Sequence, residues 1–356
     1  MEAAETMLKK KRVPGRGAIL WMAVCLSSML CVILLVPGLL VKKIPGGDDS
    51  PSVQLAIDGS HQETVTAGGL MIPVYLTKKD EIETVQLEQY VKGVLAAEMP
   101  VEFELEALKA QAMAARTYVI RRVLEKDYSN VPVNDALVTD TTAHQAYLTD
   151  QELREKWTKG TYETNMAKID RAVNETKDLI LTYEHKPINA TFFSTSNGYT
   201  ENSEDYWPFM SPYLRSVPSP WDVKLSSRYQ ETVDITYKSM LQKLGVTSIA
   251  TTGTGTKSMK VLEWSMGHRI KKMTIGGKTF SGREVREKLG LASSQFAWKW
   301  SGSKITFTTY GYGHGVGLSQ WGANGMAKEG KTAEQIVTYY YTGISIEKAT
   351  PFIQKS

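Results

Sequence analysis

The chain has 356 residues, of which 42% are hydrophobic and 22% charged, so it is not a disordered protein and can form one large or two modest domains. Its formal net charge is +4, but residues 1–43 alone carry a balance of +5, which leaves about −1 for the remainder. No run of Lys and Arg stands in that remainder to neutralise phosphates, so nucleic acid is excluded as an expected partner.

Residues 18–41 contain no charged residue, and a helix of this length reaches roughly 36 Å, enough to cross a bilayer. More basic residues precede this segment than follow it, which predicts that residues 1–17 form a cytoplasmic basic tail. We therefore expect a single-pass protein of the cell membrane with its C-terminal domain outside the cytoplasm. A cleaved signal peptide is the alternative, but the apolar run is longer than a usual signal segment. Both cysteines, Cys25 and Cys31, lie within it, so the exported part is expected to form no disulfide.

The rest of the chain predicts an α+β fold with helices and antiparallel strands. Residues 42–68 are rich in Pro, Gly, Asp and Ser and indicate a linker, followed by an extracytoplasmic domain over residues 69–356. The expected strands are 71–76, a hairpin of 179–183 with 188–196, a segment near 261–264, and a pair, 296–300 and 304–309. The expected helices are 87–97, 104–126, 165–176, 237–244, Ser281 to Gly290, 319–329 and 332–341, with a loop at 206–220.

Glu98 is the first candidate catalytic residue. It ends an apolar helix within the sequence Ala96-Ala97-Glu98-Met99-Pro100. The negative end of the helix dipole and the apolar neighbours both disfavour its ionised form, which predicts a raised pKa suited to a general acid. The alternative interpretation is a solvated glutamate at a helix end.

Further polar residues are candidates for substrate binding. Lys109 and Arg116 border the apolar stripe of the long helix and could face Glu98, although such residues commonly extend only their charged ends to water. The glycine-rich loop 311–317 presents His314 beside Gln320, which favours a binding or catalytic edge. The polar segment that contains Ser194, Ser196 and Asn197 suits hydrogen bonding to sugar hydroxyls but equally an ordinary turn. His144 has no cysteine partner, and no histidine spacing indicates a metal, so we expect neither a metal nor a cofactor.

Four ordered blocks carry a resemblance to a known family: LEQYVKGVLAAEMP, EALKAQAMAARTY, FFSTSNGYTE, and GHGVGLSQWGA with AKEGKTAEQIVTYYYTG. Together they resemble the stage II sporulation protein D family of lytic transglycosylases, which also has an amidase-enhancer branch. The resemblance implies cleavage between N-acetylmuramic acid and N-acetylglucosamine in peptide-free glycan strands, with 1,6-anhydro ends as products, during septal wall remodelling and engulfment. It maps the family's glutamate onto Glu98, its lysine and arginine onto Lys109 and Arg116, and its histidine onto His314.

The resemblance also bears on metals and partners. Some members carry a zinc site built with cysteines, whereas TTAHQAY here offers only His144. Implied partners are denuded peptidoglycan strands, an amidase (stage II sporulation protein P) and a membrane scaffold (stage II sporulation protein M). The alternative functions are a non-catalytic glycan-binding or amidase-enhancing module and a membrane-tethered structural protein of an envelope complex.

Overall fold

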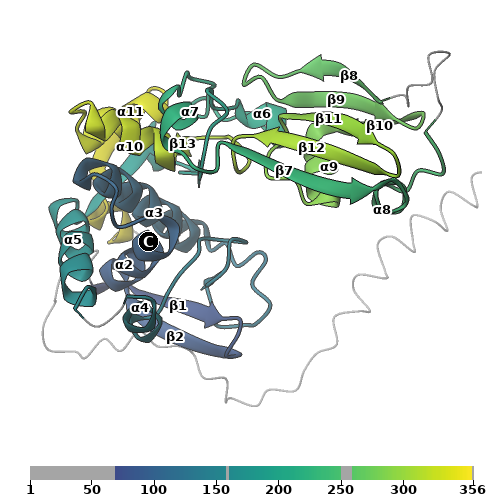
Figure 1. Ribbon diagram of the computed structural model, residues 1–356. Coiled ribbons are helices and arrows are strands. Elements are labelled where there is room, and N and C mark those ends of the chain that lie inside the picture. The colour runs from purple at the N-terminus through teal and green to yellow at the C-terminus, as the bar shows by residue number, and fades with distance from the viewer. Residues whose placement is uncertain (1–68, 158–159, 250–258, 355–356) are drawn as a thin grey trace, which may run out of the picture. The chain divides into compact units, whose positions relative to one another are not determined.

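The fold combines helices with short, mostly antiparallel strands, as predicted (Figure 1). The computed structural model describes residues 69–157, 160–249 and 259–354. The predicted tail, transmembrane helix and linker lie outside these residues. Among the residues that are described, no helix is both long and apolar enough to span a membrane.

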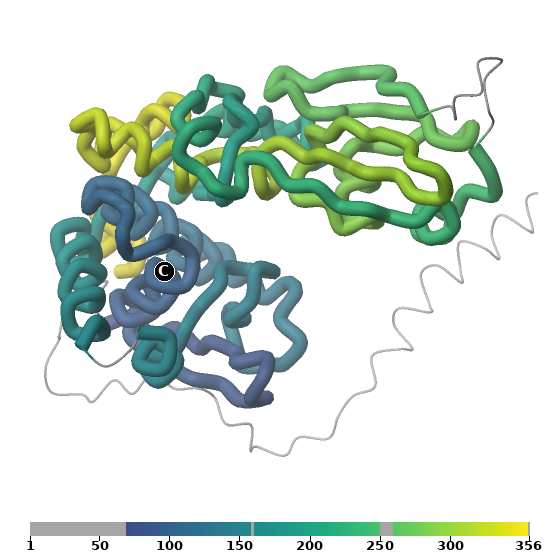
Figure 2. Tube along the Cα trace, in the orientation of Figure 1, coloured from purple at the N-terminus to yellow at the C-terminus, as the bar shows by residue number. Residues whose placement is uncertain are grey.

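Helix α3 (Leu105–Glu125) is the centre of the first hydrophobic cluster. It packs most extensively against α2 (Leu87–Glu98), α5 (Tyr162–Glu175), α10 (Gln320–Lys328), α11 (Ala333–Tyr340) and β4 (Leu179–Tyr183). Its five buried alanines leave room for this close packing. The C-terminal segment, yellow in Figure 2, thus shares a core with the N-terminal helices, and the helices predicted from periodicity are confirmed.

A short sheet leads the chain into α2. Strands β1 (Met71–Leu76) and β2 (Glu81–Gln86) pair antiparallel, and β3 (Val138–Thr139) adds parallel to β1. Helix α4 (Asp150–Lys156) also contacts α2. The alternation of β1 buries one face and confirms the predicted strand, whereas β2 was not predicted because its charged side chains are largely exposed.

The predicted hairpin of residues 179–183 with 188–196 is wrong in its second half. Strand β4 turns through two residues with positive φ and pairs antiparallel with β5 (Lys186–Pro187) on one edge and with β14 (Ser345–Lys348) on the other. Strand β6 (Phe192–Phe193) instead pairs parallel with β13 (Leu318–Ser319). This pairing joins segments more than a hundred residues apart, which local sequence patterns do not encode.

A second hydrophobic cluster fills the interior of the region between β7 and β12. Its sheets have the strand orders β10-β9-β8 and β11-β12-β7. The elements are β7 (Gln230–Thr236), α8 (Tyr237–Leu244), β8 (Met259–Trp264), β9 (Ile270–Ile275), β10 (Lys278–Ser281), α9 (Gly282–Leu289), β11 (Phe296–Ser301) and β12 (Lys304–Tyr310). Helix α9 has the predicted Ser281 cap and ends at Gly290, whose φ is 71°. Three short helices complete the chain: α6 (Ser203–Tyr206), α7 (Trp221–Leu225) and α12 (Thr350–Ile353).

Gly93 lets the segment before α4 lie directly on α2. A Cβ atom at Gly93 would stand 2.3 Å from Tyr147 Cε2 and 2.7 Å from the carbonyl oxygen of Leu148. We predict that Gly93→Ala lowers the free energy of unfolding by about 1–3 kcal/mol through overpacking, although alanine is the better helix former. Chemical denaturation measures this, with Gly69→Ala as the control because its Cβ would meet nothing within 4 Å. A Gly93→Ala protein as stable as the control would contradict the close contact.

Candidate active site

Glu98 is the last residue of α2 and is partly buried at the point where the chain leaves the helix. Its Oε1 accepts a hydrogen bond of 2.8 Å from the backbone N–H of Ala146, and its Oε2 accepts one of 3.4 Å from Nε2 of Gln320. The first donor precedes α4 and the second begins α10. Three segments that are distant in the sequence therefore meet at one carboxyl group.

Burial raises the pKa of Glu98 above its ordinary value, while the hydrogen bonds from Ala146 and Gln320 act in the opposite direction. The predicted direction is confirmed, and desolvation is the principal cause. No second carboxylate contacts Glu98 among the residues that the structure describes. A carboxyl group that keeps its proton closer to neutral pH can act as a general acid.

Gln320 contacts Glu98, and Ser194 lies beside the segment that carries Gln320. The parallel pairing of β6 with β13 brings their segments side by side, and the N–H of Trp321 donates 3.1 Å to the carbonyl oxygen of Ser194. The ring of Trp321 packs edge-on against Phe103 at 4.7 Å, which fixes the start of α10 near the turn that follows Glu98. Gln320 is thus the predicted site residue that contacts Glu98, and Ser194 is joined to its segment through the backbone of Trp321.

Ser196 and Asn197 are buried, which corrects the expectation that they present their side chains to sugar hydroxyls. Ser196 Oγ donates 2.9 Å to the carbonyl oxygen of Ser219. Asn197 Nδ2 donates a hydrogen bond of 2.8 Å to the carbonyl oxygen of Gly267, and its Oδ1 accepts one of 2.9 Å from Arg269 Nη1. These side chains hold loops in place, because buried polar groups require partners.

Asp222 is a site-supporting residue that the sequence did not reveal. Its fully buried carboxylate accepts hydrogen bonds from the N–H of Ser196 at 2.7 Å, from Ser219 Oγ at 2.7 Å, and from Ser319 Oγ. Burial raises its pKa. Because Ser319 directly precedes Gln320, Asp222 fixes the segment that carries the Glu98 partner. No local motif marks this aspartate, because only Ser219 lies near it in the sequence, whereas Ser196 and Ser319 come from distant segments.

His314 lies inside an aromatic cage. Its ring centroid is 5.7 Å from that of Phe193, 5.6 Å from Tyr206 and 5.4 Å from Trp207. Its Nδ1 accepts a hydrogen bond of 3.0 Å from the N–H of Val316. Burial, followed by the charges of nearby arginines, lowers the pKa of His314 to about 3, so the imidazole is neutral at neutral pH. None of these contacts involves Glu98.

Arg116 does not face Glu98, which corrects the second expectation for the long helix. Its fully buried guanidinium forms an ion pair with Glu88, with Nη2 to Oε2 at 2.7 Å. It also donates to the carbonyl oxygens of Val173 and Leu179. These contacts join α2, α5 and β4, so Arg116 is a structural cation and has no surface for a ligand.

Lys109 is likewise engaged in ion pairs. Its Nζ lies 2.7 Å from Glu106 Oε1 and 2.9 Å from Glu175 Oε2, and these partners raise its pKa against the effect of burial. The same residues line a hollow of about 560 Å³ against α11. Neither Glu98 nor Gln320 lines this hollow, so the structure separates Lys109 from the Glu98 contacts.

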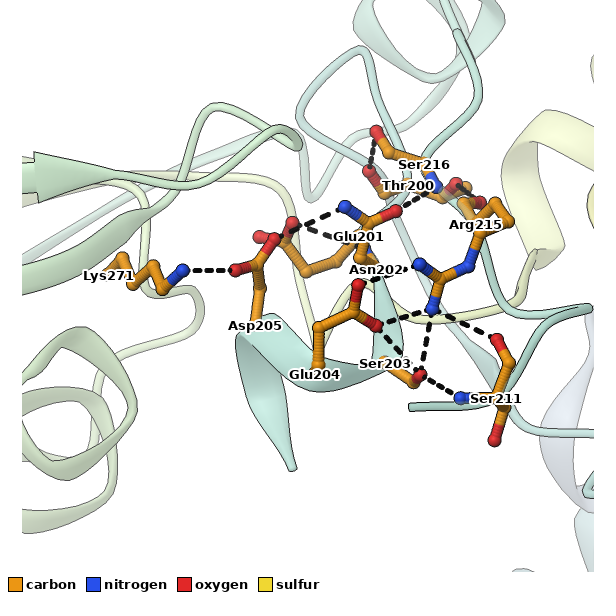
Figure 3. A network of polar contacts seen from close by, with 10 residues as sticks. All are labelled: Thr200, Glu201, Asn202, Ser203, Glu204, Asp205, Ser211, Arg215, Ser216 and Lys271. Atoms are coloured by element: carbon orange, nitrogen blue, oxygen red, sulfur yellow. Dashed lines mark hydrogen bonds and ion pairs between the residues drawn. The ribbon is translucent and has the colours of Figure 1, made fainter. Parts of the chain in front are cut away.

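Glu201 is a buried carboxylate a few residues after Asn197, and its partners belong to the turn that contains Ser265 and Gly267. Its Oε2 accepts a hydrogen bond of 2.5 Å from Ser265 Oγ, and its Oε1 accepts one of 3.0 Å from the N–H of Gly267. Figure 3 shows Glu201 within a polar network that includes Asp205, whose carboxylate pairs with Lys271 at 2.9 Å. Glu201 therefore supports the loops on which it lies and makes no contact with Glu98.

His144 uses both ring nitrogens within the protein. Nδ1 lies 2.9 Å from Thr139 Oγ1 and accepts from the N–H of Thr139, and Nε2 lies 3.1 Å from the carbonyl oxygen of Ser129. Burial lowers its pKa. The described residues contain no group of three or more His, Cys, Asp and Glu side chains arranged to hold a metal ion. Independence from zinc stays a prediction.

Comparison with known proteins supports the family resemblance that the four sequence blocks carry. A family model described as stage II sporulation protein matches residues 75–183. The chain is 46% identical over 342 residues to stage II sporulation protein D of Bacillus subtilis (strain 168), covering 94% of this chain and 97% of that protein. It is 44% identical to stage II sporulation protein D of Bacillus amyloliquefaciens, with coverage of 93% and 97%. It is also 29% identical to the amidase enhancer of Bacillus subtilis, across 72% of this chain and 40% of that protein.

The matching family model describes a class of sporulation proteins. The chain belongs to the stage II sporulation protein D family, and the resemblance predicted from the sequence is confirmed at that level.

The raised pKa of Glu98 predicts how a substitution changes stability with pH. As pH rises, the unfolded chain releases this proton before the folded protein does, so ionisation of Glu98 removes stability through the interval between the two pKa values. Glu98→Gln avoids that ionisation. We predict that it raises the melting temperature at about pH 8 more than at about pH 4, where the acid is largely protonated in both states.

The exposed Glu102→Gln is the control for this measurement, and it should show no such gain with pH. An equal effect of Glu98→Gln at both pH values would mean that Glu98 is not desolvated in the folded protein.

Proposed function

We propose that this protein is a lytic transglycosylase that cleaves the bond between N-acetylmuramic acid and N-acetylglucosamine in peptide-free glycan strands. The observation that carries the proposal is the single, partly buried carboxyl group of Glu98, whose pKa burial raises. Membership in the stage II sporulation protein D family supports the choice of cell-wall glycan as substrate.

One carboxyl group is enough for this reaction. Protonated Glu98 donates its proton to the glycosidic oxygen, the bond from C1 of the muramic acid breaks, and an oxocarbenium-like centre forms. The Glu98 carboxylate then takes the proton of the C6 hydroxyl on the same sugar while that oxygen bonds to C1. The product carries a 1,6-anhydro ring, the proton has returned to Glu98, and no water is consumed.

The partners of Glu98 have matching roles in this scheme. The N–H of Ala146 and the amide of Gln320 donate to the carboxylate form, which keeps Glu98 able to act as a base in the second step. Burial favours the protonated form needed in the first step. Ordinary glycoside hydrolases use a second carboxylate to activate water or attack the sugar. The described residues place none in contact with Glu98.

A non-catalytic role as an amidase-enhancing module is the second candidate. The 29% identity to a protein named amidase enhancer favours it, but that relative matches over only 40% of its own length. The cellular setting is also part of the proposal: anchorage in the cell membrane by residues 18–41, action in septal wall remodelling during sporulation, and assembly with an amidase and a membrane scaffold protein.

Glu98→Gln tests the catalytic assignment. Gln keeps the size of the side chain but cannot deliver a proton, so we predict that turnover of peptide-free glycan strands by the full chain falls by about a hundredfold or more. Retention on the same strands should be largely unchanged, because the loss lies in the chemical step. The exposed Glu102→Gln serves as the matched control and should cleave normally. Normal turnover by Glu98→Gln would reject Glu98 as the acid, and an inactive wild type would favour the amidase-enhancing role.

A further inference from the structure

Two adjoining hollows lie on the part of the fold that contains β8, β9 and β11. The first has a volume of about 410 Å³ and is lined by Trp264, Ser265, His268 and Gln295. The second, of about 330 Å³, is lined by Val261, Trp264, Phe296, Ala297 and Trp298. Trp264 lines both, and 54% of its surface is exposed. None of these residues contacts Glu98, so the hollows are distinct from the site described above.

Residues 265–268 form a turn that lines the first hollow, and hydrogen bonds from a neighbouring segment hold this turn in place. Glu201 accepts hydrogen bonds from Ser265 and Gly267, and Asn197 donates to the carbonyl oxygen of Gly267. A Cβ at Gly267 would come within 2.5 Å of the carbonyl oxygen of Thr200, so the turn is packed tightly on the segment below it. Asn197, which was expected to bind sugar, therefore positions this turn.

His268 belongs to this turn, lines the first hollow and has a strained backbone conformation. His268 has a φ of 60°, an uncommon conformation for a residue other than glycine. Its ring stacks on that of Tyr199 with centroids 4.4 Å apart and an interplanar angle of 8°. Strain of this kind persists where the surroundings enforce it, and it is enriched at functional sites.

The lining combines aromatic faces with amide and hydroxyl groups. Gln295 Oε1 is buried and has no hydrogen-bond partner among the described residues. A half-turn of its amide exchanges the donor and acceptor ends, so either can be offered to a ligand. The negative face of an aromatic ring such as Trp264 attracts the C–H groups of a sugar ring, and polar groups at its side pair with hydroxyls. This mixture suits a carbohydrate.

We infer that the two hollows form a second glycan-binding surface, which holds a stretch of the strand that is not being cleaved at Glu98. The inference rests on the proposed function, since it assigns the same polymer to both sites. Two hollows sharing one exposed tryptophan fit an extended chain of sugar rings better than a single small ligand.

A protein strand added to the edge of β8 is the competing occupant. Among the described strands β8 ends its sheet, but its pairing with β9 is irregular at Val261, Glu263 and Trp264. Bulges and charged side chains at a sheet edge disfavour the addition of a strand.

The test separates binding from cleavage. Affinity of the full chain for immobilised peptide-free glycan strands is measured in the Glu98→Gln background, so that no strand is cut. Adding Trp264→Ala should weaken binding about tenfold. The substitution removes a ring on which a sugar can stack, so one glycan strand is no longer held at both surfaces at once. Adding Leu262→Ala should leave binding unchanged, since Leu262 is 48% exposed on the same strand but lines neither hollow.

In the otherwise unsubstituted chain, Trp264→Ala should raise KM on long strands and leave kcat unchanged. Equal affinities for the Trp264→Ala and Leu262→Ala proteins would overturn the second surface and favour a protein partner at β8. That outcome leaves the role of Glu98 unaffected, whereas normal turnover by Glu98→Gln alone would reject the proposed function and not this surface.

Discussion

Removal of the Glu98 carboxyl group from water is the constraint on which the candidate site depends. Burial raises the cost of ionisation, and the two hydrogen bonds from Ala146 and Gln320 limit that cost. The proposed reaction requires both protonation states of this group within one cycle, and the opposing effects of burial and hydrogen bonding suit that requirement. A fully solvated glutamate would be ionised at neutral pH, and a fully unpartnered buried one would not release its proton.

The rest of the fold holds the three segments that meet at Glu98. Gly93 lets the Ala146 segment lie on α2, and Asp222 ties Ser319, next to Gln320, to the loop after β6. Arg116 joins α2 to α5 and β4 with a buried ion pair. Buried polar groups of this kind contribute more to fixing one arrangement than to net stability, because their desolvation offsets much of their attraction. These contacts hold the segments that meet at Glu98 in one arrangement.

The sequence predicted the elements better than their pairing. Helical periodicity located α2 and α3, the Ser281 cap and Gly290 located α9, and the position of Glu98 at the end of an apolar helix predicted the direction of its pKa. The partnership of β6 with β13 was missed, since hydrogen bonds between distant segments leave no local pattern. For the same reason Lys109, Arg116, Ser196 and Asn197 were expected to meet a ligand. A motif shows which polar residues matter but not whether each faces substrate or the protein interior, and here burial places several of them inside.

The most direct test of the account is the fate of water during cleavage. Peptide-free glycan strands are digested by the full chain in water labelled with oxygen-18, and the new ends are analysed by mass spectrometry. If Glu98 acts alone as acid and base, the products carry 1,6-anhydro ends, their masses sum to that of the parent strand, and no label is incorporated. Reducing ends that contain oxygen-18 would show that water attacks the sugar, and would contradict a mechanism with a single carboxyl group.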